Sequence, residues 1–305
     1  MTSMRSCPVC GAGATEATSF LKANVDTARL DQFSYASRKT PEYMNLNLVR
    51  CLRCDLVYAD EPPTQDDLAR AYHVADYDSA EEADDAATTY IRAMEPVLEA
   101  LPRRQSVLEI GTGTGVLLEH LSRQGFTELV GVEPSAAAIA AAPPHRQTWI
   151  RPGVFQEGDF IPESFDLICC FMTMEHVVDP RTVAEAAWRL LRPGGAFVTV
   201  THDYRARLNK LLGRRSPIID IEHMQLFSSQ SIRTLFQGSG FQRVDVERIV
   251  NRYAFRYWWR LAPVPTPLKR GVSKSAQLIG LDGVKLGFNV GNSITSGYKP
   301  ANYVA

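Results

Sequence analysis

Two acidic side chains, Glu109 and Glu133, are the residues best placed for ligand chemistry, because each of them ends a short apolar run. Glu109 leads into the glycine-dense turn Gly111-Thr112-Gly113-Thr114-Gly115. Glycines at alternate positions let the backbone turn sharply and approach a ligand with no Cβ in the way. A carboxylate before such a turn would repel a pyrophosphate and attract a ligand that carries an ammonium or a sulfonium. The pattern therefore favours a cationic ligand without phosphate.

A second kind of ligand chemistry is indicated by two C-x-x-C motifs, which contain Cys7, Cys10, Cys51 and Cys54. Each motif directs two thiolates at one point, and four thiolates complete the tetrahedral site that zinc prefers. Two structural disulfides are disfavoured in a reducing cytoplasm, and a redox pair would need only one motif. We therefore predict zinc, in a structural role, because four protein thiolates leave no coordination position open.

Candidate general bases occur later in the chain. His202 ends an apolar run, where Asp203 can orient it, and Glu222-His223 is an adjacent acid and imidazole just before a predicted helix. Such groups can remove a proton from an acceptor during a transfer reaction. A histidine before a helix is also commonly a packing residue, so both interpretations of His223 stay open. For His176 a structural or ligand-adjacent role is favoured.

The elements that would position these groups are short apolar strands that alternate with amphipathic helices, which is typical of an α/β fold. The first strand covers 107–110, and the second ends at Glu133, where Pro134 stops it. In open α/β sheets, ligands lie beyond the carboxyl ends of the strands, which adds Phe171 and Met172 to the expected site. Further strands are expected over 148–150, 165–171, 196–201, 242–250 and 286–298.

The string E-x-G-x-G-x-G at Glu109, the acid that ends the second strand, and the later order FD-L-I … EHV-DP … LLRPGG resemble the class I S-adenosylmethionine-dependent methyltransferases. The resemblance implies a Rossmann-like, seven-stranded methyltransferase sheet and S-adenosylmethionine as cofactor. A dinucleotide is disfavoured, since its fingerprint would place a glycine where this chain has Val116. The cofactor-binding residues implied are Glu109, Gly111, Thr112, Gly113, Glu133, Pro134, Phe171 and Met172.

A narrower resemblance is carried by the paired C-x-x-C motifs ahead of such a core and by the string E-H-x-x-x-F-S that begins at Glu222. Together they are similar to the deoxysugar C-methyltransferases, which implies that Glu222 and His223 lie at the active site, with His202 as a further catalytic candidate. That family usually has a tyrosine where this chain has Asp220, and a large additional C-terminal domain. Carbon methylation is therefore not implied, and transfer to oxygen, carbon or nitrogen stays open.

The expected domain organisation has three parts. Residues 1–62 would form a small zinc-ribbon-like module, 63–103 a helical linker or lid, and 104–305 the methyltransferase domain. An aromatic and basic insert, at about 251–284, interrupts the last part. The insert would form a pocket wall or packed surface, a dimer contact or a peripheral membrane contact.

Composition limits the partners. A formal net charge of −1 and a pI near 6.6 argue against a nucleic-acid binder. No apolar run approaches the roughly 20 residues that span a bilayer, and the first residues have no apolar signal core, so a cytoplasmic location is expected. The basic stretch from Arg205 to Arg215 suggests that the acceptor is anionic. The oligomeric state is not indicated.

The leading hypothesis is an enzyme that transfers a methyl group from S-adenosylmethionine to a small molecule, a sugar or a glycan or natural-product precursor. The alternative is a non-catalytic regulator that keeps the cofactor fold while its zinc ribbon binds a protein or RNA. The two acidic strand ends, Glu109 and Glu133, argue against the alternative.

Overall fold

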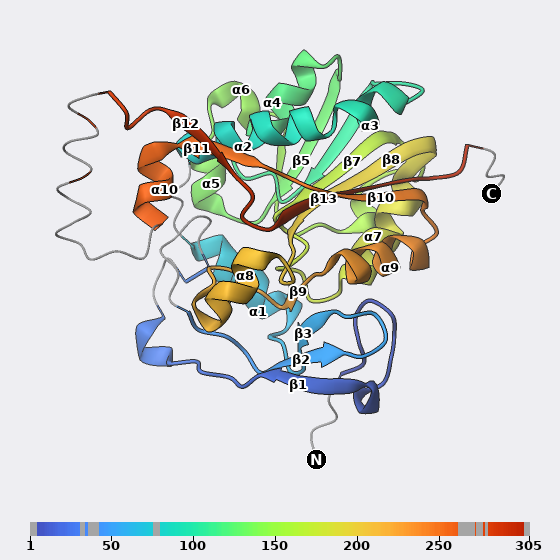
Figure 1. The fold of residues 1–305 in the computed structure, drawn as a ribbon. Coiled ribbons are helices and arrows are strands. Elements are labelled where there is room, and N and C mark those ends of the chain that lie inside the picture. Colours follow the sequence, from blue (N-terminus) through green and yellow to red (C-terminus); the bar gives the residue numbers. More distant parts are fainter. Residues whose placement is uncertain are drawn as a thin grey trace.

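The computed structural model describes residues 5–30, 34–35, 43–75, 80–261, 272, 277 and 280–301. Its central feature is a seven-stranded sheet with the order β10-β13-β8-β7-β4-β5-β6 (Figure 1). The strands from β8 to β6 are parallel, and β13 runs antiparallel to β8 and to β10. The Rossmann-like, seven-stranded sheet predicted from the sequence is confirmed. Its strands are β4 (Ser106–Ile110), β5 (Glu128–Glu133), β6 (Ile150–Pro152), β7 (Phe165–Phe171), β8 (Leu191–His202), β10 (Gln242–Arg248) and β13 (Asn292–Tyr298).

Successive side chains of each strand pack on opposite faces of this sheet, as the two-residue period of a β-strand requires. In β7, Cys170 belongs to the core cluster on one face and Cys169 to the cluster on the other, so both of these cysteines are core residues. Helices α7 (Pro180–Leu190) and α9 (Ser229–Gly238) cover the first face (Figure 1). Helices α2 (Ala80–Ala93), α3 (Glu95–Ala100) and α4 (Val116–Arg123) cover the second face.

Several helices begin at capping side chains that the sequence supplies. The carboxylate of Asp179 accepts hydrogen bonds from two backbone N–H groups at the start of α7, and Pro180 occupies the first helical position. Ser135 caps α5 and Ser228 caps α9 in the same way. Further α-helices in the described ranges are α1 (Gln65–Val74), α5 (Ala136–Ala141), α6 (Pro144–Gln147), α8 (Arg207–Leu212) and α10 (Phe255–Leu261). Short 3-10 helices are η1 (Ala14–Glu16), η2 (Thr27–Arg29), η3 (Glu157–Asp159) and η4 (Gly213–Arg215).

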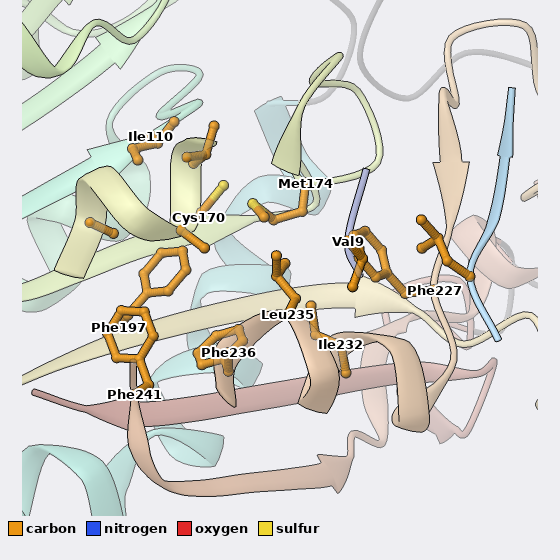
Figure 2. Packing of buried hydrophobic residues seen from close by; sticks show 14 of the residues in the cluster. Val9, Ile110, Cys170, Met174, Phe197, Phe227, Ile232, Leu235, Phe236 and Phe241 are labelled. Atoms are coloured by element: carbon orange, nitrogen blue, oxygen red, sulfur yellow. The ribbon is translucent and has the colours of Figure 1, made fainter. Parts of the chain in front are cut away.

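The N-terminal part forms a second, four-stranded sheet with the order β1-β2-β3-β9. Its strands are β1 (Ala17–Leu21), β2 (Leu48–Cys51), β3 (Val57–Ala59) and β9 (Gln225–Leu226). This sheet lies on the α9 side of the large sheet (Figure 1). Its side chains Val49 and Tyr58 continue the core cluster of that side, whereas Val57 and Leu226 belong to a separate cluster. Figure 2 shows Val9 beside Phe227 and Ile232 in the core cluster of the α9 side. The N-terminal part therefore packs into the core of the fold.

The insert after β10 forms a small antiparallel pair, β11 (Asn251–Ala254) with β12 (Lys285–Phe288), and the helix α10. The prediction of a single strand over 286–298 is wrong, because the chain forms two strands there, β12 and β13, that belong to different sheets. Gly291, with φ +93°, lies in the break between them, and this left-handed backbone conformation does not continue a strand. Within the described ranges, no helix combines the length and the apolar character that crossing a bilayer requires.

Candidate active site

The turn after β4 is built from glycines that other residues could not replace without strain. Gly111 has φ +77°, and a Cβ at this position would lie 2.2 Å from the Oγ1 atom of Thr173. The backbone N–H groups of Gly111 and Thr112 both donate to the carbonyl of Val132, at 2.9 and 3.1 Å. These contacts hold the turn against the neighbouring strand β5 and against the loop after β7. The loops after three adjacent strands therefore meet at one point, at the carboxyl edge of the sheet.

The two acidic strand ends predicted to bind the cofactor are both buried beside this turn. Glu133 accepts hydrogen bonds from the N–H groups of Gly113 and Ser135, at 2.7 and 2.8 Å. Glu109 accepts a hydrogen bond from the Thr112 hydroxyl at 2.5 Å. Burial raises the pKa of Glu133 above its ordinary value and that of Glu109 to about 8. A cation bound nearby would favour the ionised form of both groups.

A cavity of about 650 Å³ adjoins the turn, and all eight predicted cofactor-binding residues line it. Met172, at the end of β7, has φ +52°, an unusual backbone conformation for a residue with a side chain. Such strain is concentrated at functional sites, where surrounding structure maintains it. Lining residues that the sequence did not single out include Ser135 and Asn292. Of these residues, only Ser135 could have been expected at the site from the sequence, because it directly follows Pro134 and the acidic end of a strand.

Beyond the predicted cofactor-binding residues, the same cavity is lined by His176, His202 and Glu222. The Nδ1 atom of His176 lies 2.9 Å from the hydroxyl of Tyr72 and 3.6 Å from a carboxylate oxygen of Glu222. Burial raises the pKa of Tyr72 well above its ordinary value, so its hydroxyl stays protonated and can donate to His176. The Nδ1 atom of His202 lies 2.8 Å from Oδ1 of Asn292. The arrangement can accept and pass on a proton.

His223 occupies a different position from the other two predicted catalytic residues. Its ring is buried between those of His176 and His202, with ring centroids 4.8 and 5.7 Å away, and it is not among the residues that line the cavity. Its Nδ1 atom lies 2.8 Å from the carbonyl oxygen of Ile218, which indicates a donated hydrogen bond. His176, Glu222 and His223 offer ligand atoms within 4.8 Å of one another.

A buried carboxylate that sequence reasoning missed fixes the end of β8. Glu175 accepts a hydrogen bond from the backbone N–H of His202 at 2.6 Å, and its own carbonyl accepts one from the N–H of Met224 at 2.8 Å. Burial raises the pKa of Glu175 to about 7. The residue thus connects the loop after β7, the end of β8 and the chain before β9. Its position beside His176 in the EHV string was the available signal.

Aromatic side chains of the insert form one wall of the cavity. Tyr253, Tyr257 and Trp258 line it, and the ring centroids of Tyr253 lie 4.5 Å from Tyr257 and 5.3 Å from Trp258. Residues of α8 and the following turn add apolar surface on the same side, among them Leu208 and Ile218. The described part of the insert therefore forms a pocket wall, which is one of the alternatives that the sequence left open. Tyr77, which belongs to the expected helical linker or lid of residues 63–103, lies outside the described residues.

The four cysteines of the two C-x-x-C motifs converge, with all sulfur atoms within 4.8 Å of one another. The Sγ atoms of Cys7 and Cys54 are 3.5 Å apart, as are those of Cys10 and Cys51, and all are unpaired thiols. A tetrahedral zinc site with Zn–S distances of about 2.3 Å places its sulfurs about 3.8 Å apart, whereas a disulfide needs about 2.0 Å. The donor set and its spacing fit zinc.

Comparison with known families is consistent with this geometry, since a model described as a methyltransferase domain matches residues 81–246. The chain belongs to the class I S-adenosylmethionine-dependent methyltransferase family. The match extends from α2 into β10, so this methyltransferase carries the acidic strand ends and the predicted acceptor residues inside the family domain.

Among curated relatives, the methyltransferase is 32% identical over 120 residues to a ubiquinone biosynthesis O-methyltransferase of Pseudomonas fluorescens. That match covers 36% of this chain and 50% of the relative, so the chain spans about half the length of the curated relatives it matches. A methyltransferase structure from Archaeoglobus fulgidus aligns with a TM-score of 0.48 and 15% identity, over 70% of this chain and 94% of that one. A geranyl diphosphate C-methyltransferase from Streptomyces coelicolor aligns with a TM-score of 0.47 and 13% identity, over 78% and 100% of the two chains.

The raised pKa of Glu109 predicts how cofactor affinity depends on pH. With a pKa of about 8, the carboxyl is protonated in the ligand-free protein at neutral pH, whereas a cationic ligand favours the carboxylate. Binding should therefore release a proton, and affinity for S-adenosylmethionine should rise by up to about ten-fold per pH unit until about pH 8. Calorimetric titrations at several pH values, with Glu109→Gln in parallel, measure this. Equal pH dependence in the two proteins would contradict the assignment.

Proposed function

We propose that this protein transfers the methyl group of S-adenosylmethionine to a small-molecule acceptor. The observation that carries the proposal is one continuous cavity, with buried carboxylates and a glycine turn in one part and proton-accepting side chains in another. Methyl transfer is an in-line displacement, so it needs an aligned acceptor and a group that takes its proton. The shared cavity would bring both requirements together.

On the cofactor side, Glu133 would accept hydrogen bonds from the ribose hydroxyls, and Glu109 would face the cationic methionine part. Gly111, Thr112 and Gly113 would supply close backbone approach, with Pro134, Phe171 and Met172 as further lining. The bound cofactor supplies an electrophilic methyl group on its sulfonium. The protein excludes water by burial, since Glu109 and Glu133 are only 4% and 8% exposed.

On the acceptor side, Glu222 and His202 are the groups proposed to take the acceptor's proton. Glu222 lines the cavity with His176 beside it, and His202 lines it with Nδ1 close to Asn292. An Nδ1–H bond to the Asn292 oxygen would leave the Nε2 atom as the basic one. His223 would help to position His176 and His202, because its ring packs against the rings of both.

The acceptor that suits this cavity has a flat apolar face, as an aromatic ring or the face of a sugar ring has. Aromatic side chains of the insert supply a matching surface. The cavity lining within the described residues contains four carboxylates, Glu82, Glu109, Glu133 and Glu222, and no lysine or arginine. Arg205, one of the residues that suggested an anionic acceptor, pairs with Asp55 instead. We therefore favour an uncharged acceptor over an anionic one.

We also propose zinc at the four cysteines, as the structural ion of the N-terminal module. Elemental analysis should find about one zinc per chain, and Cys54→Ser should lose it and unfold at a lower temperature, because structural zinc contributes directly to folding. Cys170→Ala is the matched control, since this cysteine is a buried residue of β7 outside the cluster. Full zinc content in Cys54→Ser, or its loss in the control as well, would refute the assignment.

The regulator hypothesis is disfavoured by the way the N-terminal module is built. A module that served only to bind a protein or RNA would not need to build the site, whereas strand β3 pairs with β9 of the methyltransferase core and part of this sheet joins the core cluster of the large sheet. The proposed activity is tested by incubating the protein with methyl-labelled S-adenosylmethionine and a panel of phenols, sugars and sugar nucleotides. Label in an acceptor supports it. Tight cofactor binding with no transfer to any class would favour the regulator.

A further inference from the structure

The N-terminal sheet takes its fourth strand from the acceptor side of the methyltransferase core. In β9, Leu226 lies opposite Val57 of β3, and Gln225 lies opposite Tyr58. The backbone N–H of Ala59 also donates to the carbonyl of Met224 at 2.8 Å. We call residues 216–228 the acceptor segment, because they contain both Glu222 and β9. A displacement of β3 would therefore displace the chain that carries Glu222.

Asp55 connects the second cysteine motif to two parts of the acceptor side. It directly follows Cys54, is 8% exposed and has φ +67°. Its carboxylate binds the guanidinium of Arg205 through two hydrogen bonds and accepts one from the Tyr204 hydroxyl at 2.8 Å. Its carbonyl lies 3.4 Å from the hydroxyl of Ser228, at the end of the acceptor segment. Tyr204 and Arg205 closely follow His202, the other proposed proton acceptor.

A third part of the acceptor side is held from the same module. The side chain of Arg181 donates to the carbonyl of Val9, within the first cysteine motif, at 2.5 and 3.0 Å. Arg5 donates to the carbonyl of Val178 at 2.9 Å. Gln225 donates from its side-chain amide to the carbonyl of Met174 at 2.6 Å and to that of Val177 at 2.7 Å. The loop that carries His176 is thus fixed on both sides.

We infer that the cysteine-bearing module holds the acceptor half of the active site in place, and that Asp55 is the positioning residue through which it does so. The role of the held residues rests on the proposed function. The cofactor half has a separate support, since Glu109, Glu133 and the glycine turn are held by hydrogen bonds within the turn, to β5 and to the start of α5. The module therefore affects acceptor geometry and leaves cofactor binding unchanged.

Hydrogen exchange of the zinc-containing protein tests this without any acceptor. In Asp55→Asn, amide exchange should accelerate roughly ten-fold in residues 200–206 and 216–228, because charge-assisted hydrogen bonds are lost. Residues 106–116, zinc content and the affinity for S-adenosylmethionine should be unchanged. Asp26→Asn is the matched control, since Asp26 is an exposed acid of the same module that caps η2. The control should match the wild-type protein.

Three further variants keep the test decisive if Asp55→Asn folds poorly. Tyr204→Phe removes only one hydroxyl and should give a smaller change in the same segments. Arg205→Lys keeps a cation and should exchange more slowly than Arg205→Gln in residues 216–228. Unchanged exchange there in Arg205→Gln and Tyr204→Phe would overturn the inference, as would equal acceleration throughout the core. Failure of the wild-type protein to bind S-adenosylmethionine would instead refute the proposed function.

Discussion

Replacing Glu133 by alanine is expected to weaken the binding of S-adenosylmethionine by about 10²- to 10⁴-fold. The proposed ribose contacts are two hydrogen bonds to a charged group, each contributing about 1.5–3 kcal/mol, and about 1.4 kcal/mol corresponds to ten-fold in affinity. The substitution also removes the acceptor for the N–H groups of Gly113 and Ser135, so the turn loses support. Calorimetry measures the loss directly.

The matched control for this prediction is Glu128→Ala, at the other end of the same strand. Glu128 is exposed and bonds the side-chain amide of Gln105 at 2.7 Å, so its replacement should change cofactor affinity by less than about three-fold. Comparable losses in both variants would show that the strand has been disrupted. A Glu133→Ala protein that binds as well as the wild type would remove the assigned role.

Replacing Glu222 by glutamine is expected to lower the rate of methyl transfer by about 10²- to 10⁴-fold, with cofactor affinity within about three-fold of the wild type. Glutamine keeps the size of the side chain but cannot take a proton, and general-base contributions are typically of this magnitude. The measurement is the turnover of labelled S-adenosylmethionine with the acceptor that the panel identifies.

The matched control is Glu247→Gln, which makes the same chemical change at an exposed side chain of β10 and should leave the rate of methyl transfer unaltered.

The variant His202→Gln distinguishes between the two candidate bases, Glu222 and His202. If it abolishes turnover while Glu222→Gln does not, the base is His202 and Glu222 has only a positioning role. If neither variant loses activity, neither Glu222 nor His202 serves as the base. This result is expected for an acceptor that is already deprotonated when it binds.

The convergence of the proposed cofactor-binding residues could be predicted from sequence because the elements that carry them are local. An apolar strand, an acidic end and a glycine turn occur within a few residues, and the strand predicted over 165–171 coincides with β7. The eight cofactor-binding residues that the resemblance to methyltransferases implied all line one cavity. Local order along the chain is sufficient here, because parallel strands bring their carboxyl ends to the same edge.

The acceptor half could not be predicted to the same degree, since it depends on contacts between distant segments. β9 has two residues, too few for any periodicity, and pairs with a strand more than 150 residues earlier. The contact of Asp55 with Arg205, separated by 150 residues, leaves no local pattern either. The burial of His223 behind His176 and His202 likewise follows from tertiary packing. For the insert, the sequence left a pocket wall or packed surface, a dimer contact and a membrane contact as alternatives, and the structure brings Tyr253 and Trp258 to the cavity.

Titration of the purified protein with S-adenosylmethionine and, separately, with NADH tests most directly whether the acidic strand ends select a cationic nucleoside without phosphate. We expect a single site for S-adenosylmethionine, with a dissociation constant in roughly the micromolar range, and no measurable binding of NADH. Binding of NADH at the Glu133 site, with no binding of S-adenosylmethionine, would contradict the proposed chemistry.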